Sequence, residues 1–294
     1  MTKRNGVTAL WTALALSTAL AAAPPESGWE PVDQVLGFAG KDLPGGVRRY
    51  GWPRSDLRVT VGDVVVEPAL ALGSWAGFLR TGGATMTMGD LVVLDAELAP
   101  VLAELESGGF DVLAIHNHLA EESPSVLYVH FHGHGDAAGL AKTLQAALAK
   151  TKTPAPGGAP RSATSEQTAV FEKVQESLGR KGSMAGVVLQ VGVPRAEPIR
   201  DGGVEVPASF GMSTALNFQA IGDRVATTGD FVLVADEVNP VIRELRAHGI
   251  AATALHSHML TETPRLFFMH FWGVGSPEEV GAGLKAALGK TAVR

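Results

Sequence analysis

Apolar positions in the second half of the chain recur first at helical spacing and then at strand spacing. Asn239 and Pro240 are typical of a helix start, because Asn caps a helix and Pro fits its first position. Apolar residues then form one stripe, and Gly249 favours the helix end. Strands are predicted to follow at about 251–260 and 266–272.

The first half of the chain shows the same succession. A helix is predicted to begin at Pro100, and strands follow at about 111–119 and 126–132. Asp136 is in position to cap a further helix, as a capping box at 276–279 is in the second half. Each half therefore reads strand–helix–strand–strand–helix.

This order repeats because the sequence repeats. Gly89–Leu94 resembles Gly229–Val234 at an offset of 140, and the alignment runs without a gap for about 60 positions. Upstream, Pro53–Asp56 matches Pro194–Glu197 at an offset of 141. The predicted fold class is α+β, with two tandem copies of a ferredoxin-like unit. We expect an antiparallel sheet with helices on one face in each copy, and a pseudo-twofold pairing of the copies.

Composition divides the chain into segments. Residues 1–23 resemble a secretory signal peptide, with two basic residues, a 17-residue apolar run and small residues before Pro24. A membrane anchor is the alternative, and no other apolar run approaches membrane-spanning length. Residues 151–166 are rich in Pro and Gly and read as a linker between copies at 28–150 and 167–294, the second beginning with a short helix near 170–178. We expect a secreted or periplasmic protein.

Composition also restricts the chemistry. The chain has no cysteine, which excludes disulfides, lipid attachment through a lipobox cysteine, and thiolate metal ligands. The formal net charge is −6, and no basic stretch interleaves with aromatic residues, so nucleic-acid binding is not expected.

Histidine is the residue with an unusual distribution. Eight of the nine histidines lie on the predicted strand pairs, and three positions recur in both copies. Imidazoles suit zinc, copper, nickel or iron, and we expect a divalent transition metal, zinc or copper, as cofactor. The candidate metal ligands are His116, His118, His130, His132, His256, His258 and His270.

Strand geometry supports the cluster. Side chains two residues apart share a face of a strand. A hairpin centred near residue 124 is predicted to place His118 opposite His130, and His116 opposite His132, at Cβ separations of about 5 Å. Trp272 replaces His132 in the second copy. The alternatives are a metal-free polar pocket and histidines that serve only the packing.

Other residues are candidates for supporting roles. Glu122 and Glu262 follow the His-x-His pairs and are candidate general bases. Arg54 and Arg195 recur in a Pro-Arg-x-acid motif and either bind a substrate anion or pair with the acid of the motif. Asp90 and Asp230 follow a glycine and are interpreted as turn residues.

The segments 256–260 and 264–273, with the doubled His-x-His and the Pro-Arg-x-acid motif, resemble the LppY/LpqO family of bacterial secreted proteins. The resemblance covers nearly the whole mature chain. It implies export and a shared fold but no reaction, because that family is a domain of unknown function.

Three functions remain open from the sequence. The first is a metal-binding protein that buffers, carries or senses zinc or copper. The second is a metal-dependent hydrolase, in which a metal with an open position activates water. The third is a metal-free module that binds a small molecule and responds to pH through its histidines.

Overall fold

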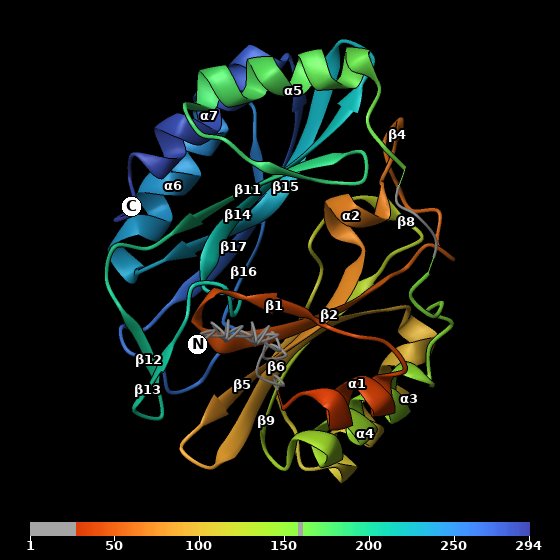
Figure 1. The fold of residues 1–294 in the computed structure, drawn as a ribbon. Coiled ribbons are helices and arrows are strands. Elements are labelled where there is room, and N and C mark those ends of the chain that lie inside the picture. Colours follow the sequence, from red (N-terminus) through yellow and green to blue (C-terminus); the bar gives the residue numbers. More distant parts are fainter. Residues whose placement is uncertain (1–27, 158–160) are drawn as a thin grey trace, which may run out of the picture.

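The computed structural model describes residues 28–157 and 161–294. Figure 1 shows two sheets that face one another across the middle of the molecule, with helices on their outer sides. Each sheet has six strands, in the orders β1-β2-β5-β6-β9-β7 and β10-β11-β14-β15-β17-β16, and all pairings within them are antiparallel. The chain is thus a tandem repeat of an α+β unit.

The elements of the first copy are, in chain order, α1 (Glu30–Leu36), β1 (Lys41–Leu43), a 3₁₀ turn (Pro44–Gly46), β2 (Val47–Pro53), β3 (Thr60–Val61), β4 (Val64–Val65), α2 (Pro68–Ala71), β5 (Gly73–Thr81), β6 (Ala84–Val93), α3 (Asp95–Ser107), β7 (Asp111–His116), β8 (Glu122–Ser123), β9 (Leu127–Gly135) and α4 (Ala137–Leu148).

The elements of the second copy are α5 (Ser165–Leu178), β10 (Ser183–Ala185), β11 (Val188–Pro194), β12 (Ile199–Asp201), β13 (Val204–Val206), β14 (Ser213–Ile221), β15 (Arg224–Leu233), α6 (Ala235–Ala247), β16 (Ala251–His256), β17 (Phe267–Gly275) and α7 (Pro277–Leu288). Helix α5 begins before the predicted short helix near 170–178, inside the predicted linker. Thr164 and Gln167 form a capping box at its start.

The ferredoxin-like part of each copy is its second half. Strand β9 lies between β6 and β7, and it is antiparallel to both. Helix α3 joins β6 to β7, and α4 follows β9. This is the split β-α-β arrangement that the element order predicts. Strand β5 occupies the place beside β6 where a final strand of a ferredoxin-like unit would pair.

The predicted helix starts at Pro100 and Pro240 are wrong. Helices α3 and α6 begin five residues earlier, at Asp95 and Ala235, and both prolines lie inside them. Glu97 fixes the true start of α3, because its carboxylate accepts the backbone N–H of Leu94. The true helix start is not evident from the sequence alone, because the Glu97 carboxylate is held in place by Arg54, which lies in a distant loop. Asp136 caps α4 as predicted, accepting the backbone N–H of Gly139.

The hydrophobic residues form two kinds of core. One core in each copy lies between the sheet and its helices, and it contains residues of one copy only. Two further clusters contain buried residues of both copies, such as Met88 with Phe268 and Tyr128 with Val188. The inner faces of the two sheets are therefore packed against each other, as in a β-sandwich.

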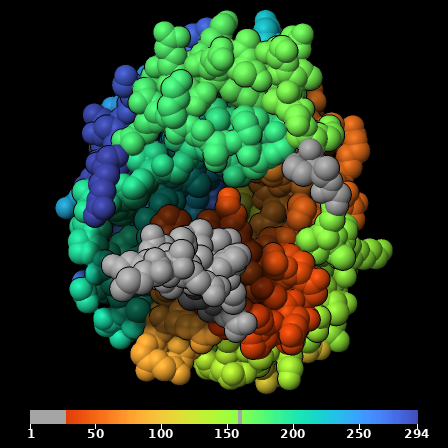
Figure 2. Space-filling model, in the orientation of Figure 1, coloured from red at the N-terminus to blue at the C-terminus, as the bar shows by residue number. Residues whose placement is uncertain are grey.

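Each copy also extends a segment, here called an arm, onto the other copy: residues 64–71 of the first copy and residues 199–206 of the second. The segment after β4 is held by Gln219 of the second copy, which donates to the Val65 carbonyl and accepts the Glu67 N–H. In return, Ile199 and Val206 of the β12–β13 hairpin pack with strands of the first copy. Figure 2 shows the two halves, red to yellow-green and green to blue, meeting across the molecule. This exchange fixes how the inner faces of the sheets are aligned.

The predicted signal peptide, residues 1–23, lies outside the described residues. In the part of the chain that the structure describes, every helix is too short or too polar to cross a bilayer.

Candidate metal centre

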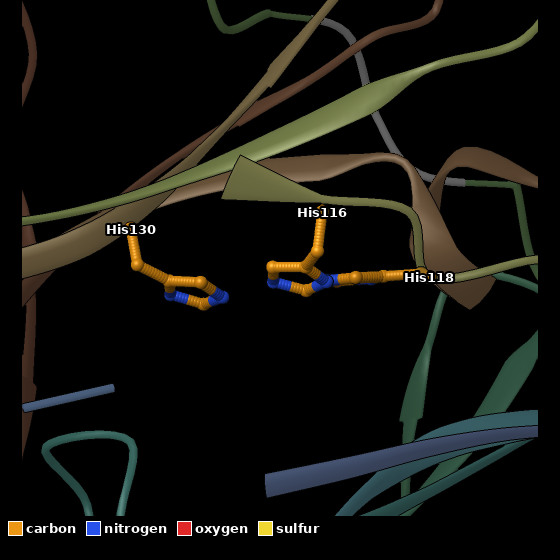
Figure 3. Close-up of side chains that lie close together, drawn as sticks. All are labelled: His116, His118 and His130. Atoms are coloured by element: carbon orange, nitrogen blue, oxygen red, sulfur yellow. The ribbon is translucent and has the colours of Figure 1, made fainter. Parts of the chain in front are cut away.

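Six histidines, three from each copy, occupy equivalent places on the two inner sheet faces. His116 is the last residue of β7, His118 lies two residues beyond it, and His130 is in the middle of β9. His256, His258 and His270 repeat these places on β16, the following loop and β17. Figure 3 shows the three side chains of the first copy directed to the same side of their sheet. The convergence of each triple agrees with the strand alternation.

The predicted register of the hairpin is wrong. His130 lies opposite Ala114, and His116 lies opposite Tyr128. The pairing shifts at a β-bulge between Val112 and Ala114. The connection is also a wide loop rather than a tight turn, because β8 within it pairs with β3. The same register occurs in the second copy.

The six imidazoles form one cluster across the interface of the copies. The ring centroids of His116 and His256 are 3.7 Å apart, and those of His118 and His270 are also 3.7 Å apart. The rings of His130 and His258 are separated by 4.0 Å. Each of these three close pairs joins one copy to the other.

The ring nitrogens come within reach of a common ion. Three overlapping groups have ligand atoms that all lie within 4.8 Å of one another, and two of the groups contain histidines of both copies. Nitrogens bound to a tetrahedral zinc are about 3.3 Å apart, since each bond is about 2.0 Å long. Small side-chain rotations would therefore close a metal site. The groups are His116/His118/His130, His116/His256/His270 and His130/His256/His258.

The hydrogen bonds of the rings leave the nitrogens that face the centre without a partner. Nδ1 of His270 is 2.8 Å from the Gly229 carbonyl, and Nδ1 of His116 is 3.1 Å from the Asn117 carbonyl. A carbonyl only accepts, so each Nδ1 carries the proton and each Nε2 offers a lone pair. The Nε2 atoms of all six histidines are buried without a hydrogen-bond partner in the described residues. Backbone bonds of this kind orient metal-binding histidines in proteins.

Two aspartates complete the centre. Asp90 lies opposite His130 on β6, and Asp230 lies opposite His270 on β15. Asp90 Oδ2 is 3.4 Å from Nε2 of His118, and Asp230 Oδ2 is 3.3 Å from Nε2 of His258. The Oδ1 atoms of both aspartates are buried without a hydrogen-bond partner in the described residues.

The interpretation of Asp90 and Asp230 as turn residues is therefore wrong. Both lie inside ten-residue strands, β6 and β15. A sequence signal for their role existed, because both aspartates are retained at the offset that relates the six histidines. Aspartate is uncommon in strands, so a retained strand aspartate indicates a function.

Burial favours the uncharged form of every group in the centre. It lowers the pKa of His116 and His270 to about 4 and of His258 to about 3, and burial together with the neighbouring imidazoles also lowers the pKa of His118, His130 and His256. Burial raises the pKa of Asp230 to about 6, and burial with the nearby Asp230 charge raises the pKa of Asp90. Neutral imidazoles are the form that binds a metal. A bound cation would also relieve the cost of two buried carboxylates.

These shifts predict that the metal-free protein loses stability as the pH falls from about 6.5 to about 4. Unfolded histidines take up protons near their ordinary pKa of 6.5, whereas folded His116 and His270 do so only near 4. The aspartates act in the opposite direction, because folded Asp230 already binds a proton near pH 6. The stability lost through the six imidazoles is expected to exceed the stability gained through the two carboxylates, because more groups contribute to the loss.

Thermal unfolding of EDTA-treated protein between pH 7.5 and 4.5 measures this effect. A variant with Gln at positions 116 and 256 should show a shallower decline, since two of the shifted groups are gone. An unfolding temperature that is flat with pH would contradict the burial of neutral imidazoles.

His132 lies apart from the six. It is on the same face of β9 as His130, but its ring is 4.5 Å from that of His134, and it belongs to none of the three ligand groups. The predicted ligation depended on a position opposite His116, which the observed register gives to Tyr128 instead. The assignment of His132 as a ligand of this centre is corrected accordingly.

Glu122 and Glu262 belong to none of the ligand groups either and serve the loops after the His-x-His pairs. Glu122 accepts hydrogen bonds from the Asn117 side chain and the Val126 N–H. Glu262 accepts from the Leu266 N–H and pairs with an arginine three residues away. Burial raises the pKa of the Glu122 carboxyl. The structure assigns both glutamates to holding the loops that carry His118 and His258.

The substrate-binding interpretation of Arg54 and Arg195 is wrong, and the alternative ion pair is confirmed. Arg54 is fully buried and donates to Asp56, to both oxygens of Glu97 and to the Val92 carbonyl. Arg195 makes the equivalent hydrogen bonds in the second copy, to Glu197, to both oxygens of Glu237 and to the Val232 carbonyl. No guanidinium N–H of either residue remains for a ligand, because all five already donate to these partners. The motif therefore anchors a helix start to the sheet.

A cavity adjoins the centre. Its volume is about 570 Å³, and its wall includes His118, His130, His258 and His270 together with both aspartates. Cavities of this size hold small organic ligands. No local sequence pattern predicts this cavity, because residues of both copies form its wall.

Comparison with known proteins gives a family but no activity. The model of a Domain of Unknown Function (DUF1259) matches residues 30–150 and, a second time, residues 172–290. No curated protein matches the chain. A crystal structure of a trimeric bacterial microcompartment shell protein, PduB, matches with 11% identity and a TM-score of 0.19, over 85% of this chain and 89% of that chain. At that TM-score the likeness supports no inference about fold or assembly.

Proposed function

The chain belongs to the family described as Domain of Unknown Function (DUF1259), and we propose that its six inward-facing histidines bind one transition-metal centre shared by the two copies. The observation that carries this proposal is the set of six buried, unpartnered Nε2 atoms beside two unpartnered carboxylate oxygens. Buried polar groups are normally satisfied, and a bound metal would satisfy those of these atoms that become its ligands.

The donor set favours zinc or copper. Imidazole nitrogens suit both metals, and carboxylate oxygens complete many zinc sites. His116, His130 and His256 are central, because each of them belongs to two of the three ligand groups. When bound, the metal would supply a Lewis acid at the cavity wall, while the protein's own residues orient the ligands.

The finer family resemblance and the location are also proposals. The doubled His-x-His and the Pro-Arg-x-acid motif support a relation to the LppY/LpqO family. The apolar run within residues 1–23 supports export to the periplasm or the cell exterior. The proposed role is to buffer, carry or sense the metal there.

Metal content tests the proposal most simply. We expect the mature protein, dialysed against zinc or copper and then against metal-free buffer, to retain bound metal in elemental mass spectrometry. His248→Ala is the control variant, because its ring binds only the Glu244 carbonyl in α6 and should leave the content unchanged. A wild-type protein that retains neither metal would overturn the proposal.

Asp90 and Asp230, rather than the two glutamates, are expected to support the metal. Replacing either aspartate by Asn should weaken zinc binding about 10- to 100-fold, as loss of a charged partner beside the ligands does. Glu122→Gln is the matched control, since Glu122 bonds to its own loop and the change should have little effect. Competition with a chromophoric zinc chelator measures both. Equal effects of D90N and E122Q would refute this division of roles.

The cavity supports a second candidate, a metal-dependent hydrolase. A ligand that fills the cavity would lie against the histidines and against Asp90 and Asp230. A carboxylate beside a metal can serve as general base. The zinc-loaded protein would then hydrolyse p-nitrophenyl esters or phosphates, and D90N or D230N would remove that activity. Turnover equal to that of the EDTA-treated protein would leave metal binding as the function.

A further inference from the structure

The cavity beside the metal centre is not symmetric. Arg49 and Trp75 form part of its wall in the first copy, and the equivalent positions of the second copy are Gln190 and Ala215. All four residues line the same cavity. A pseudo-twofold site therefore carries the Arg49 cation and the rings of Trp75 and Trp52 on a single side.

The second copy uses its side of the wall to hold the other copy. Gln190 donates a hydrogen bond of 3.1 Å to the Ala69 carbonyl, and Asn217 donates one of 3.1 Å to the Leu70 carbonyl. Both carbonyls belong to α2 of the first copy. Gln190 is thus committed to the interface between the copies.

Arg49 has no such commitment. Its guanidinium carbon lies 4.1 Å above the centre of the Trp75 ring, and within the described residues no carbonyl or carboxylate accepts a hydrogen bond from it. A guanidinium stacked on an aromatic ring keeps its N–H groups in its own plane, free to donate. Burial lowers the pKa of Arg49 to about 10, so it stays charged at neutral pH.

The Asp90 carboxyl acts electrostatically on Arg49, but among the described residues the two groups form no ion pair within 4.0 Å. A ligand between them has room, because the cavity volume is about 570 Å³. The planar fork of a guanidinium matches the two oxygens of a carboxylate. The ring of Trp75 and the flanking Pro53 and Pro68 add apolar surface for a carbon skeleton.

We propose that the cavity binds a small organic carboxylate, held through its two oxygens by Arg49 on Trp75, with its other end directed to the histidine centre. This rests on the proposed function, because it names the ligand class of the same site. It also gives the asymmetry a role, since one cation orients such a ligand in a single direction across the pseudo-twofold axis.

Calorimetric titration with acetate, succinate and benzoate tests the proposal, and benzamide serves as the uncharged counterpart of benzoate. Zinc-loaded wild type should bind benzoate more tightly than benzamide. Arg49→Gln, which installs the residue of the second copy, should weaken carboxylate binding about tenfold or more, as loss of a charge-assisted bond does. Arg58→Gln is the control, because Arg58 is exposed and does not line the cavity.

The zinc content of each variant separates the two proposals. If R49Q retains zinc and loses carboxylate binding, both stand. If wild type holds no zinc, the metal proposal fails, and the same titrations on metal-free protein still measure the effect of Arg49. The carboxylate proposal is overturned if no carboxylate binds to wild type, or if R49Q binds all of them as wild type does.

Discussion

Replacing Arg195 by methionine is expected to destabilise the protein by about 3–5 kcal/mol, the usual effect of removing one partner of a buried ion pair. The Arg195 side chain is 1% exposed, and its partner Glu237 lies at the start of α6. The change would leave a buried carboxylate without its cation. It would also weaken two further attachments, because Glu237 accepts the N–H groups of Val234 and Ala292 as well.

The matched control is Arg200→Met. Arg200 also pairs with a glutamate, but the two side chains are 56% and 63% exposed, and exposed pairs contribute about 0–1 kcal/mol. Urea unfolding of both variants gives the comparison. If R195M and R200M unfold at the same midpoint, the motif does not anchor the fold. A Met/Leu pair at 195 and 237 should recover part of the loss, since it removes both charges.

Replacing His256 by alanine is expected to weaken zinc binding about 100-fold or more, a larger effect than loss of a supporting group outside the ligands. His256 belongs to two of the three ligand groups, one with His116 and one with His130. Its loss therefore removes a ligand from both groups that join histidines of the two copies. Both of its ring nitrogens are buried without a partner in the described residues, so alanine breaks no hydrogen bond of the fold.

Competition against a zinc chelator, with His248→Ala as control, measures the affinity. A shared centre requires that the affinity of all bound zinc falls in H256A. If half of the zinc remained at wild-type affinity, each copy would hold a separate site, and the shared centre would be refuted.

The sequence predicted what depends on local pattern and repetition. The offset of 140 identified the duplication, and strand alternation placed three histidines of each copy on one face. The order strand–helix–strand–strand–helix predicted the split β-α-β unit, because short connections of this kind pair in few ways. These features need no knowledge of how the two copies pack.

The features that the sequence did not predict depend on distant contacts. The register of His116 against Tyr128 follows from a bulge and from the pairing of β8 with β3, which lies about 60 residues earlier. The start of α3 depends on the bond between Glu97 and Arg54, across 43 positions. Asp90 looked like a turn residue because its role appears only when the second copy covers it.

The shared centre itself also lay beyond sequence reasoning. Each copy alone offers three histidines, and the sequence left one shared site or two equally open. The exchanged arms, held by contacts such as those of Gln219 with Val65 and Glu67, bring the two triples within reach of one another.

The most direct test of the shared centre is a zinc titration followed by long-range ¹H–¹⁵N NMR spectra of the histidine side chains, assigned by single substitutions. We expect the Nε2 resonances of histidines from both copies, including His116 and His256, to change together as the first equivalent of zinc binds. A first equivalent that shifts the histidines of one copy alone, or of neither, would contradict it.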